Sequence, residues 1–206
     1  MAEYIIQEES LVELADILRE KYWWIQMIED RSKVNITTWP YHLLGLTSIG
    51  VSAFSYCKNL ALTSLPESLT SIGGSAFYDC SNLALTSLPE GLTSINNAAF
   101  SHCSNLALTS LPEGLTSIGS TAFYNCSSLA LTSLPESLTS IGDSAFYRCT
   151  NLTTLTFKGT PRSINLSAFN GCTNLTTINV PWAEGAVANA PWGATNATIN
   201  YNYVEE

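Results

Sequence analysis

Six cysteines have the type and the spacing that most suggest chemistry in this chain. They recur with a constant 23-residue period, at Cys57, Cys80, Cys103, Cys126, Cys149 and Cys172. Cysteines in proteins form disulfides, bind metals or act as nucleophiles. A constant spacing indicates stacked repeats, in which equivalent thiols form a column with neighbours about 5 Å apart. Free, buried thiols are the favoured interpretation, because pairing in twos would make equivalent repeats unequal, and disulfides between neighbours are the alternative.

A metal site in this column is less favoured, because no histidine shares the column and ligands in a line do not close a tetrahedron. A second column consists of carboxylates in turns, at Glu67, Glu90, Glu113 and Glu136. Neighbouring carboxylates can share Ca²⁺, but solvated turn residues are the favoured interpretation. The sequence contains no glycine-rich phosphate loop and no nucleophile elbow. It therefore predicts no catalytic residue, no cofactor and no metal, and a protein that is not an enzyme.

The composition limits the partners that this chain can bind. The chain has 206 residues, of which 46% are hydrophobic and only 12% charged, with a formal net charge of -9. It can bury one core or form one short repeat array. Negative charge opposes binding to nucleic acid and to anionic membrane surfaces, and no apolar run is long enough to span a bilayer. The first ten residues lack the basic start and apolar run of a signal peptide, which favours a chain that starts in the cytoplasm of its producer.

The 23-residue period extends to the apolar residues around each cysteine. An isoleucine precedes each cysteine by eight residues, an Ala-Phe pair ends three residues before it, and a leucine follows three residues after it. A fixed period of this length is typical of a solenoid. Within one repeat, "LALTSLP" and "LTSI" read as short strands around a turn, and "SAFYDCSNL" has the apolar spacing of a short helix. A single coil cannot bury its own edges, so stacked coils and caps at both ends are expected.

These residues resemble a known repeat family. The pattern "LTSIGxxAFxxCxNL" is similar to the BspA-like leucine-rich repeats of bacterial surface proteins, over residues 43 to 181. The predicted fold is an α/β solenoid, a right-handed leucine-rich-repeat coil of six 23-residue repeats, each with short strands and a short helix. The expected organisation is an N-terminal helical cap or attachment segment over residues 1–40, repeats over 41–181 and a C-terminal β cap over 182–206. The resemblance implies adhesion and surface recognition.

One departure from the family pattern falls in the middle coils. The last coils read "NLTTLTF" and "NLTTINVP", whereas the middle coils read "NLALTSLP". Leu85 therefore occupies the position of Thr154, and Thr86 occupies that of Leu155. Because a one-residue slip exchanges the two faces of a strand, a bulge or a shifted pleat is expected in the middle strands.

Residues 7–28 have the pattern of an amphipathic helix that begins with a capping box. Its apolar face consists of Leu11, Leu14, Leu18, Tyr22 and Ile25. The helix is expected to cap the first coil; alternatively, it binds a partner, forms a homotrimer or attaches the chain to a larger particle. The stretch "LADILREK" also resembles a short N-terminal helix that precedes repeat or fibre domains in structural proteins of phages of gut bacteria.

The C-terminal segment loses the Phe and Cys positions of the repeat. Trp182 and Trp192 are expected to cover the last coil, with a sugar-stacking aromatic site as the alternative. The stretch "ATINYNY" predicts a final strand with Tyr201 and Tyr203 on one side.

The coils differ most at the two positions after the repeated phenylalanine, which makes these positions the candidate binding face. The ligand-binding residues predicted there are Tyr78, His102, Tyr124, Tyr147 and Arg148. Tyrosine supplies contact area and a hydrogen bond at a low entropy cost. The nearly invariant Thr/Ser strand face is an alternative surface for a repeating polysaccharide.

Several functions fit these features. The first is a non-enzymatic recognition module that binds a cell-surface glycan or protein, carried on a phage or phage-like particle that is assembled in the bacterial cytoplasm. The alternatives are a bacterial cell-surface adhesin and a purely structural spacer or assembly subunit. Neither nucleic-acid binding nor membrane insertion is expected in any of them.

Overall fold

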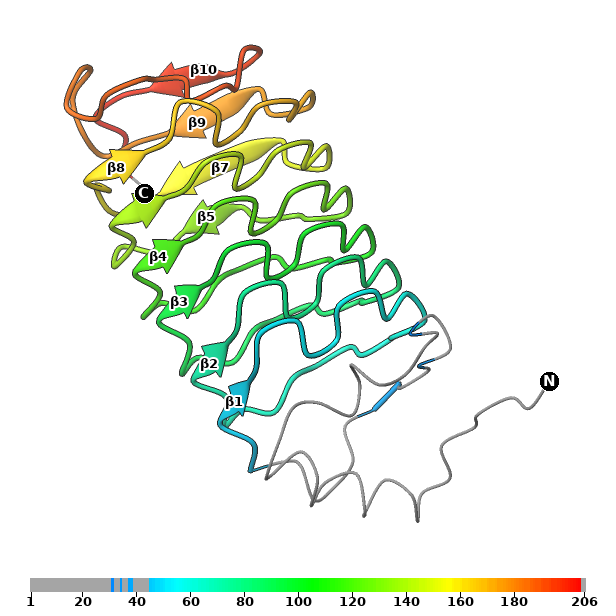
Figure 1. Cartoon of the computed structure of the whole chain (residues 1–206). Coiled ribbons are helices and arrows are strands. Elements are labelled where there is room, and N and C mark those ends of the chain that lie inside the picture. Colours follow the sequence, from blue (N-terminus) through cyan, green and yellow to red (C-terminus); the bar gives the residue numbers. More distant parts are fainter. Residues whose placement is uncertain (1–30, 32–33, 35–36, 39–44, 205–206) are drawn as a thin grey trace.

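The chain folds as a stack of parallel coils. The computed structural model describes residue 31, residue 34, residues 37–38 and residues 45–204. These residues form a right-handed parallel β-solenoid of about 7 turns with a 23-residue repeat (Figure 1). The predicted solenoid and its period are therefore confirmed.

A row of two-residue strands runs along one side of the stack, and each strand consists of a serine and an isoleucine. The strands are β1 (Ser48–Ile49), β2 (Ser71–Ile72), β3 (Ser94–Ile95), β4 (Ser117–Ile118), β6 (Ser140–Ile141) and β8 (Ser163–Ile164). Paired strands are parallel, and their partners are equivalent residues of neighbouring repeats, as in Ser117 and Ser140. Every isoleucine of the row is at most 3% exposed, because alternate residues of a strand face opposite sides and this one faces the core.

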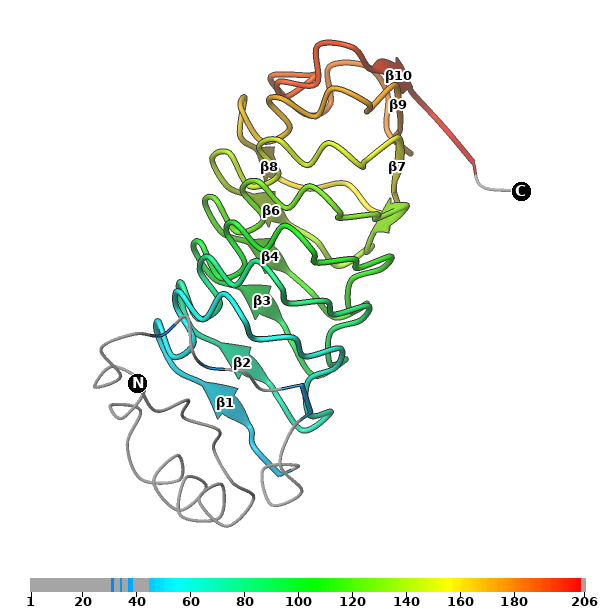
Figure 2. The same cartoon turned by 90° about the vertical axis from the view of Figure 1, so that its right-hand side faces the viewer.

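A second row of parallel strands lies on a different side of the stack (Figure 2). It consists of β5 (Ser133–Leu134), β7 (Thr154–Phe157), β9 (Thr177–Asn179) and β10 (Thr198–Asn200). The strands pair in the order β10-β9-β7-β5. In the coils before β5, the equivalent stretches form no strand.

The leucine shift falls in the coils before β7, where the second row is short or absent. The leucines Leu62, Leu85, Leu108 and Leu131 are all buried. Their equivalent in β7 is the exposed Thr154. The N–H of Ala84 donates to the carbonyl oxygen of Leu62, and the separation of these two residues is one short of a full repeat. The shifted stretches form no strand in the first three of these coils and the two-residue β5 in the fourth, so the shift accompanies short or missing strand pairing.

The prediction of a short helix in each coil is wrong, because the described residues contain no α-helix. The "SAFYDC" segment forms consecutive turns instead. Its N–H groups alternate between two acceptors: Tyr78 donates to Ser75 in its own turn at 3.1 Å, and Phe77 donates to Ala99 in the next coil at 2.8 Å. Ser75 and Asp79 also take left-handed backbone, at φ 55° and 56°. An α-helix would direct every N–H four residues back along its own chain and would leave carbonyl groups of the next coil unpaired.

Ala98→Gly is expected to stabilise the protein by about 0.5–1 kcal/mol. Ala98 has φ at 55°, a left-handed conformation in which a Cβ destabilises the folded state by about 1–2 kcal/mol. Glycine removes this strain, but its larger conformational entropy in the unfolded chain offsets part of the stabilisation. Urea unfolding at pH 7 measures the change. The matched control is Ala99→Gly, since Ala99 is fully buried and has no positive φ, and this variant is expected to lose stability. Equal losses in both variants would contradict the expectation.

Columns of identical side chains fill the interior of the stack. The six repeated phenylalanines stack ring on ring, with neighbouring centroids 5.1–5.7 Å apart and planes within 14° of each other. They are Phe54, Phe77, Phe100, Phe123, Phe146 and Phe169. None is more than 4% exposed. Stacking therefore buries the edges that a single coil would leave open.

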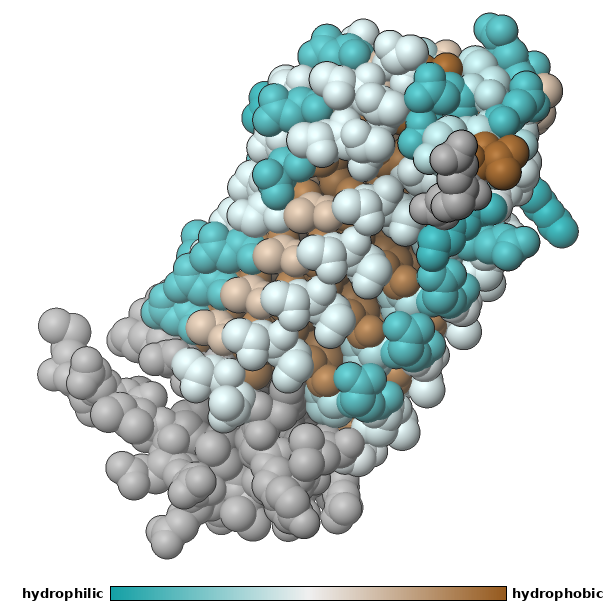
Figure 3. Space-filling view, turned by 180° about the vertical axis from the view of Figure 1, so that it is seen from behind, coloured by the Kyte–Doolittle hydropathy of each residue, from teal (hydrophilic) through white to brown (hydrophobic). Residues whose placement is uncertain are grey.

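The side chains on one outer face of the stack repeat from coil to coil. On the face shown in Figure 3, side chains of intermediate hydropathy run in columns along the stack, and strongly hydrophilic side chains gather along its borders. Threonine hydroxyls contribute to the stacking: Oγ1 of Thr116 donates to the carbonyl oxygen of Thr93, and Oγ1 of Thr139 donates to that of Thr116, both at 2.9 Å. These hydrogen bonds link neighbouring coils.

The C-terminal segment closes the stack with two indoles, as predicted. Trp192 is fully buried, and its Nε1 donates to the carbonyl oxygen of Ala188 at 2.7 Å. Trp182 is 6% exposed, and its ring centroid lies 6.3 Å from that of Trp192 and 5.3 Å from that of Phe157. Both indoles are core residues, so they do not form a sugar-stacking site at the surface.

The final strand is shorter than predicted. β10 ends at Asn200, so Tyr201 and Tyr203 follow the strand rather than lying in it. Tyr201 packs against the core, whereas Tyr203 is exposed.

The predicted N-terminal helix over residues 7–28 lies outside the described residues. Its apolar face (Leu11, Leu14, Leu18, Tyr22 and Ile25) therefore stays a prediction, as does its role in capping or assembly. In the part of the chain that the structure describes, no helix has the length and apolar character that crossing a membrane requires.

Candidate functional site

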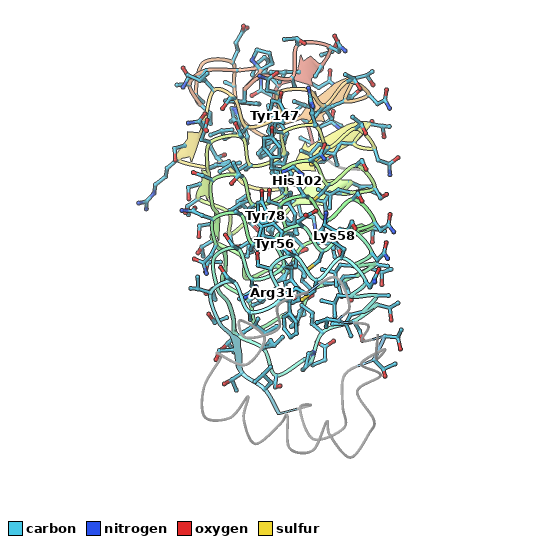
Figure 4. All side chains as sticks on the ribbon, turned by 45° about the vertical axis from the view of Figure 1, so that its right-hand side comes forward. Arg31, Tyr56, Lys58, Tyr78, His102 and Tyr147 are labelled. Atoms are coloured by element: carbon cyan, nitrogen blue, oxygen red, sulfur yellow. The ribbon has the colours of Figure 1, made fainter. Side chains whose placement is uncertain are left out.

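One aromatic ring from each of five consecutive coils lies in a continuous row along the stack, and Figure 4 labels Tyr56, Tyr78, His102 and Tyr147 of this row. We call this row the aromatic ladder; it consists of Tyr56, Tyr78, His102, Tyr124 and Tyr147. Neighbouring ring centroids are 4.6–5.5 Å apart. The first two contacts are edge to face, the third is tilted, and the last is a parallel stack with 10° between the planes. All five side chains are half-buried or exposed, so a ligand can reach them.

The ladder is built from two sequence positions. Three rings come from the residue directly after the repeated phenylalanine, and two, Tyr56 and His102, come from the residue after that. In these two coils the first position holds Ser55 or Ser101, which are buried. The small serine leaves room for the ring that follows it. Each of the five coils therefore contributes one ring and no more.

Backbone hydrogen bonds between coils set the spacing of the ladder. The N–H of Tyr56 donates to the carbonyl oxygen of Tyr78 at 2.6 Å, and that of His102 donates to Tyr124 at 2.7 Å. The rings are therefore separated by the rise of one coil, about 5 Å. The second position has left-handed backbone, with φ 65° at Tyr56 and 63° at His102. In the other coils it holds an aspartate, an asparagine, an arginine and a glycine, all with positive φ, and three of these four residue types favour this conformation.

Cations border the ladder. Nη1 of Arg31 donates to a backbone carbonyl oxygen of the first coil at 2.9 Å. Nζ of Lys58 lies 3.1 Å from a carboxylate oxygen of Asp79. Cζ of Arg148 lies 5.3 Å from the centre of the Tyr147 ring. Arg148 forms no salt bridge with any described residue, so its charge is available to a ligand.

The glutamate column lies in the turns about half a repeat along the chain from the ladder. Its four members, Glu67, Glu90, Glu113 and Glu136, are all exposed. Nζ of Lys158 lies 2.7 Å from a carboxylate oxygen of Glu113. No group of three or more metal-binding side chains occurs among the described residues. In the described part of the chain, the glutamate column therefore contains one paired carboxylate, at Glu113, and shows no arrangement that would hold a metal.

The six thiols are buried and free, as the spacing predicted. The thiol of Cys103 donates to the carbonyl oxygen of Phe77 at 3.0 Å, and the same bond recurs at every cysteine after the first. Burial raises the pKa of Cys57 and Cys172 to about 12 and raises the pKa of the four inner thiols further. A thiol that keeps its proton is a poor nucleophile and a poor metal ligand. These cysteines act as small apolar residues.

The structure brings together all five residues that the sequence predicted as ligand-binding. Four of them belong to the ladder, and Arg148 lies beside its last ring. Sequence reasoning missed Tyr56, which extends the ladder into the first coil. The serine before it was the available signal, because a small residue at the first position accompanies a ring at the second. Ligand binding by these residues stays a prediction.

The coils and their repeated pattern define the class of protein, a parallel solenoid of the leucine-rich-repeat type. A family model, "BspA type Leucine rich repeat region (6 copies)", matches residues 32–130 and 107–186. Together these matches cover more than half of the chain, and the chain belongs to this family. Proteins of this family are typically non-enzymatic binding modules.

Similar solved structures come from three bacteria. A leucine-rich repeat protein from T. pallidum has 35% identity and a TM-score of 0.56, and the match covers 65% of each chain. One from Bacteroides ovatus has 25% identity and a TM-score of 0.50, over 82% of this chain and 49% of that one. A leucine-rich cell surface protein from Faecalibacterium prausnitzii has 24% identity and a TM-score of 0.39, over 73% of this chain and 61% of that one. This chain therefore spans less than two thirds of each, and a comparison with curated proteins found no match.

Proposed function

We propose that this chain is a non-enzymatic binding module of a bacterial cell-surface protein, which adheres to its target through the aromatic ladder. The ladder is the observation that supports this best, because it is a continuous row of accessible rings at the positions where the coils differ most in sequence. BspA-type proteins are typically bacterial cell-surface proteins. The family therefore favours a surface adhesin over part of a phage particle, which no comparison supports.

The ladder has the properties of a binding surface. Solenoids bind through extended surfaces, and Tyr and Arg are enriched among the residues that dominate binding energies. Each ring is held by its neighbours in the adjoining coils. Little side-chain entropy is therefore lost when a ligand binds.

The Thr/Ser faces are weaker candidates. The hydroxyl protons of Thr116 and Thr139 already bond to carbonyl oxygens of the preceding coil. A ligand on that face would find acceptors but few free donors, and it would find no aromatic contact area.

The double variant Tyr78→Ala/Tyr124→Ala is expected to weaken binding at least about tenfold, because truncation of a dominant aromatic contact costs about 2 kcal/mol or more. The probe is a printed panel of polysaccharides, mucin and extracellular matrix proteins, of which the wild-type chain is expected to bind at least one. Surface plasmon resonance with the component that binds gives the Kd of each variant.

The matched control is Thr86→Ala/Thr109→Ala, since both threonines are exposed and lie away from the ladder. This variant is expected to keep the wild-type Kd, and far-UV circular dichroism checks that both variants fold. The proposal is wrong if the wild-type chain binds no component, or if the threonine variant loses as much affinity as the tyrosine variant.

A further inference from the structure

We infer that the ligand of the aromatic ladder is a linear polysaccharide that lies along the stack with one sugar unit at each ring. This inference rests on the proposed function and names the chemical class of its target. Three features carry it: the spacing of the rings, the polar groups beside them, and the way in which the ladder ends.

The spacing of the rings fits a polysaccharide better than an extended peptide. Neighbouring centroids are 4.6–5.5 Å apart, and an extended chain of 1,4-linked pyranoses advances by about one coil rise per unit. In an extended peptide, side chains on one face recur about every 6.7 Å, so peptide and ladder lose alignment within a few coils. The turns of an α-helix recur about every 5.4 Å and would match, but a docked helix needs an apolar groove.

The ladder lacks the aliphatic surface that an amphipathic helix would need. The large exposed hydrophobic residues of the described chain are Val51, Tyr56, Leu166, Tyr203 and Val204. Only Tyr56 belongs to the ladder. Protein interfaces have an apolar core from which water is excluded, whereas the ladder presents phenol groups and an imidazole.

The ring orientations suit the two kinds of surface that a sugar has, namely faces of C–H groups and edges of hydroxyl groups. In the parallel pair of Tyr124 and Tyr147 the rings cover each other's faces, so their edges and hydroxyl groups are left for a ligand. The edge-to-face pairs, Tyr56 with Tyr78 and Tyr78 with His102, leave ring faces that the pair does not cover. The ladder therefore offers apolar contact mainly at its first rings and hydrogen bonds mainly at its last two.

Asparagines three or four residues after the ring positions supply hydrogen-bonding groups in five of the six coils, and Ser128 replaces the asparagine in the coil of Tyr124. The asparagines follow the repeated cysteine by two residues and are all exposed, at Asn59, Asn82, Asn105, Asn151 and Asn174. Nδ2 of Asn151 and Nδ2 of Asn174 donate to backbone carbonyl oxygens of the preceding coil at 3.3 and 2.8 Å. These two bonds use amide N–H groups, so the amide oxygens of Asn151 and Asn174 can accept hydrogen bonds from sugar hydroxyls.

The ladder ends after five rings, which sets the number of sugar units that it can contact. In the next coil, Asn170 and Gly171 occupy the two ring positions. A Cβ at Gly171 would lie 2.9 Å from Cγ of Arg148, so the glycine leaves room for the arginine. Arg148 closes the ladder with a guanidinium, which can hold the carboxylate of an acidic sugar.

Isothermal titration calorimetry of the full chain with oligosaccharides of increasing length tests the inference. The probes are β-1,4-linked N-acetylglucosamine and α-1,4-linked galacturonate, each from disaccharide to octasaccharide. In at least one series the Kd is expected to tighten about threefold to tenfold per added unit, as one aromatic contact per unit implies. The gain should stop at the pentasaccharide. A Kd that does not depend on length, or no binding in either series, would overturn the inference.

Shortening the ladder tests the one-to-one match between rings and units. Tyr147→Ala and Tyr56→Ala each remove a terminal ring, and each is expected to move the plateau from the pentasaccharide to the tetrasaccharide. Tyr147→Phe keeps the ring and is expected to keep the pentasaccharide plateau. If the printed panel binds through protein components alone, the polysaccharide is excluded while the proposed function stands. If nothing on the panel binds, both are wrong.

Discussion

Between pH 9 and pH 10 the free energy of unfolding is expected to fall by about 6 kcal/mol, or about 1 kcal/mol for each buried thiol. In the native stack the thiols keep their protons, because burial raises the pKa of Cys57 and Cys172 from 9.0 to about 12 and raises that of the inner four further. In the unfolded chain they ionise near 9.0. The unfolded state therefore binds fewer protons above pH 9. Stability is complete below that pH and is lost as the pH rises.

Urea unfolding at pH 8, 9 and 10 measures this fall. Domains typically have a free energy of unfolding of about 5–15 kcal/mol. The free energy of unfolding of the native stack should therefore approach zero within about two pH units above 9. The control is Cys126→Ala, which removes one of the six titrating thiols. This variant is expected to reduce the slope of the free energy of unfolding against pH by about a sixth, whatever its effect on stability at pH 7. A free energy of unfolding that stays constant from pH 8 to pH 10 would contradict the expectation.

Phe100→Ala is expected to cost about 3–5 kcal/mol of stability. Phe100 is fully buried, and its ring centroid lies 5.4 Å from that of Phe77 and 5.7 Å from that of Phe123. Each coil contacts only its neighbours, so a cavity in the middle of the stack weakens the interfaces on both sides of it. Equilibrium unfolding in urea at pH 7 gives the loss.

Phe100→Leu is the matched control for this prediction. Leucine fills much of the space that alanine leaves empty, so less than half of the loss is expected. Equal losses in the two variants would show that stacking of the ring, rather than filled volume, supplies the stability.

The coils and their buried columns could be predicted because the sequence repeats them. Ile95, Phe100 and Cys103 each recur in the same environment, so several copies report the same burial. The free thiols follow from the same argument, since equivalent positions in a stack face equivalent neighbours. Any feature that every coil shares is therefore visible in the period.

The short helices were predicted wrongly because one apolar spacing fits two structures. A helix turn and a stacked turn both bury Phe77, Cys80 and Leu83 on one side. The difference lies outside the segment, in the N–H of Phe77, which bonds to Ala99 of the next coil. The apolar pattern of a single repeat carries no information about hydrogen bonds to the next coil. The pattern alone therefore favoured a helix.

The ladder was predicted as a set of residues but not as a row. The first three intervals between its rings are alternately one residue shorter and one residue longer than a repeat, so the 23-residue period does not reveal the row. Tyr56 and His102 join it only because a serine precedes each of them and the backbone there is left-handed. Rings from two different sequence positions form one row only in the folded coil.

The backbone hydrogen bonds between coils run along the axis of the stack, as from Phe100 to Ala122 and from Phe123 to Ala145. A force that pulls the first and last coils apart would load these bonds lengthwise, and the bonds at one interface could break without disturbing the next. Coils would then peel off singly. Each would release about 80 Å of extended chain in exchange for about 5 Å of rise. Under tension the solenoid would act as an extensible tether, and the coils still stacked would keep their rings aligned.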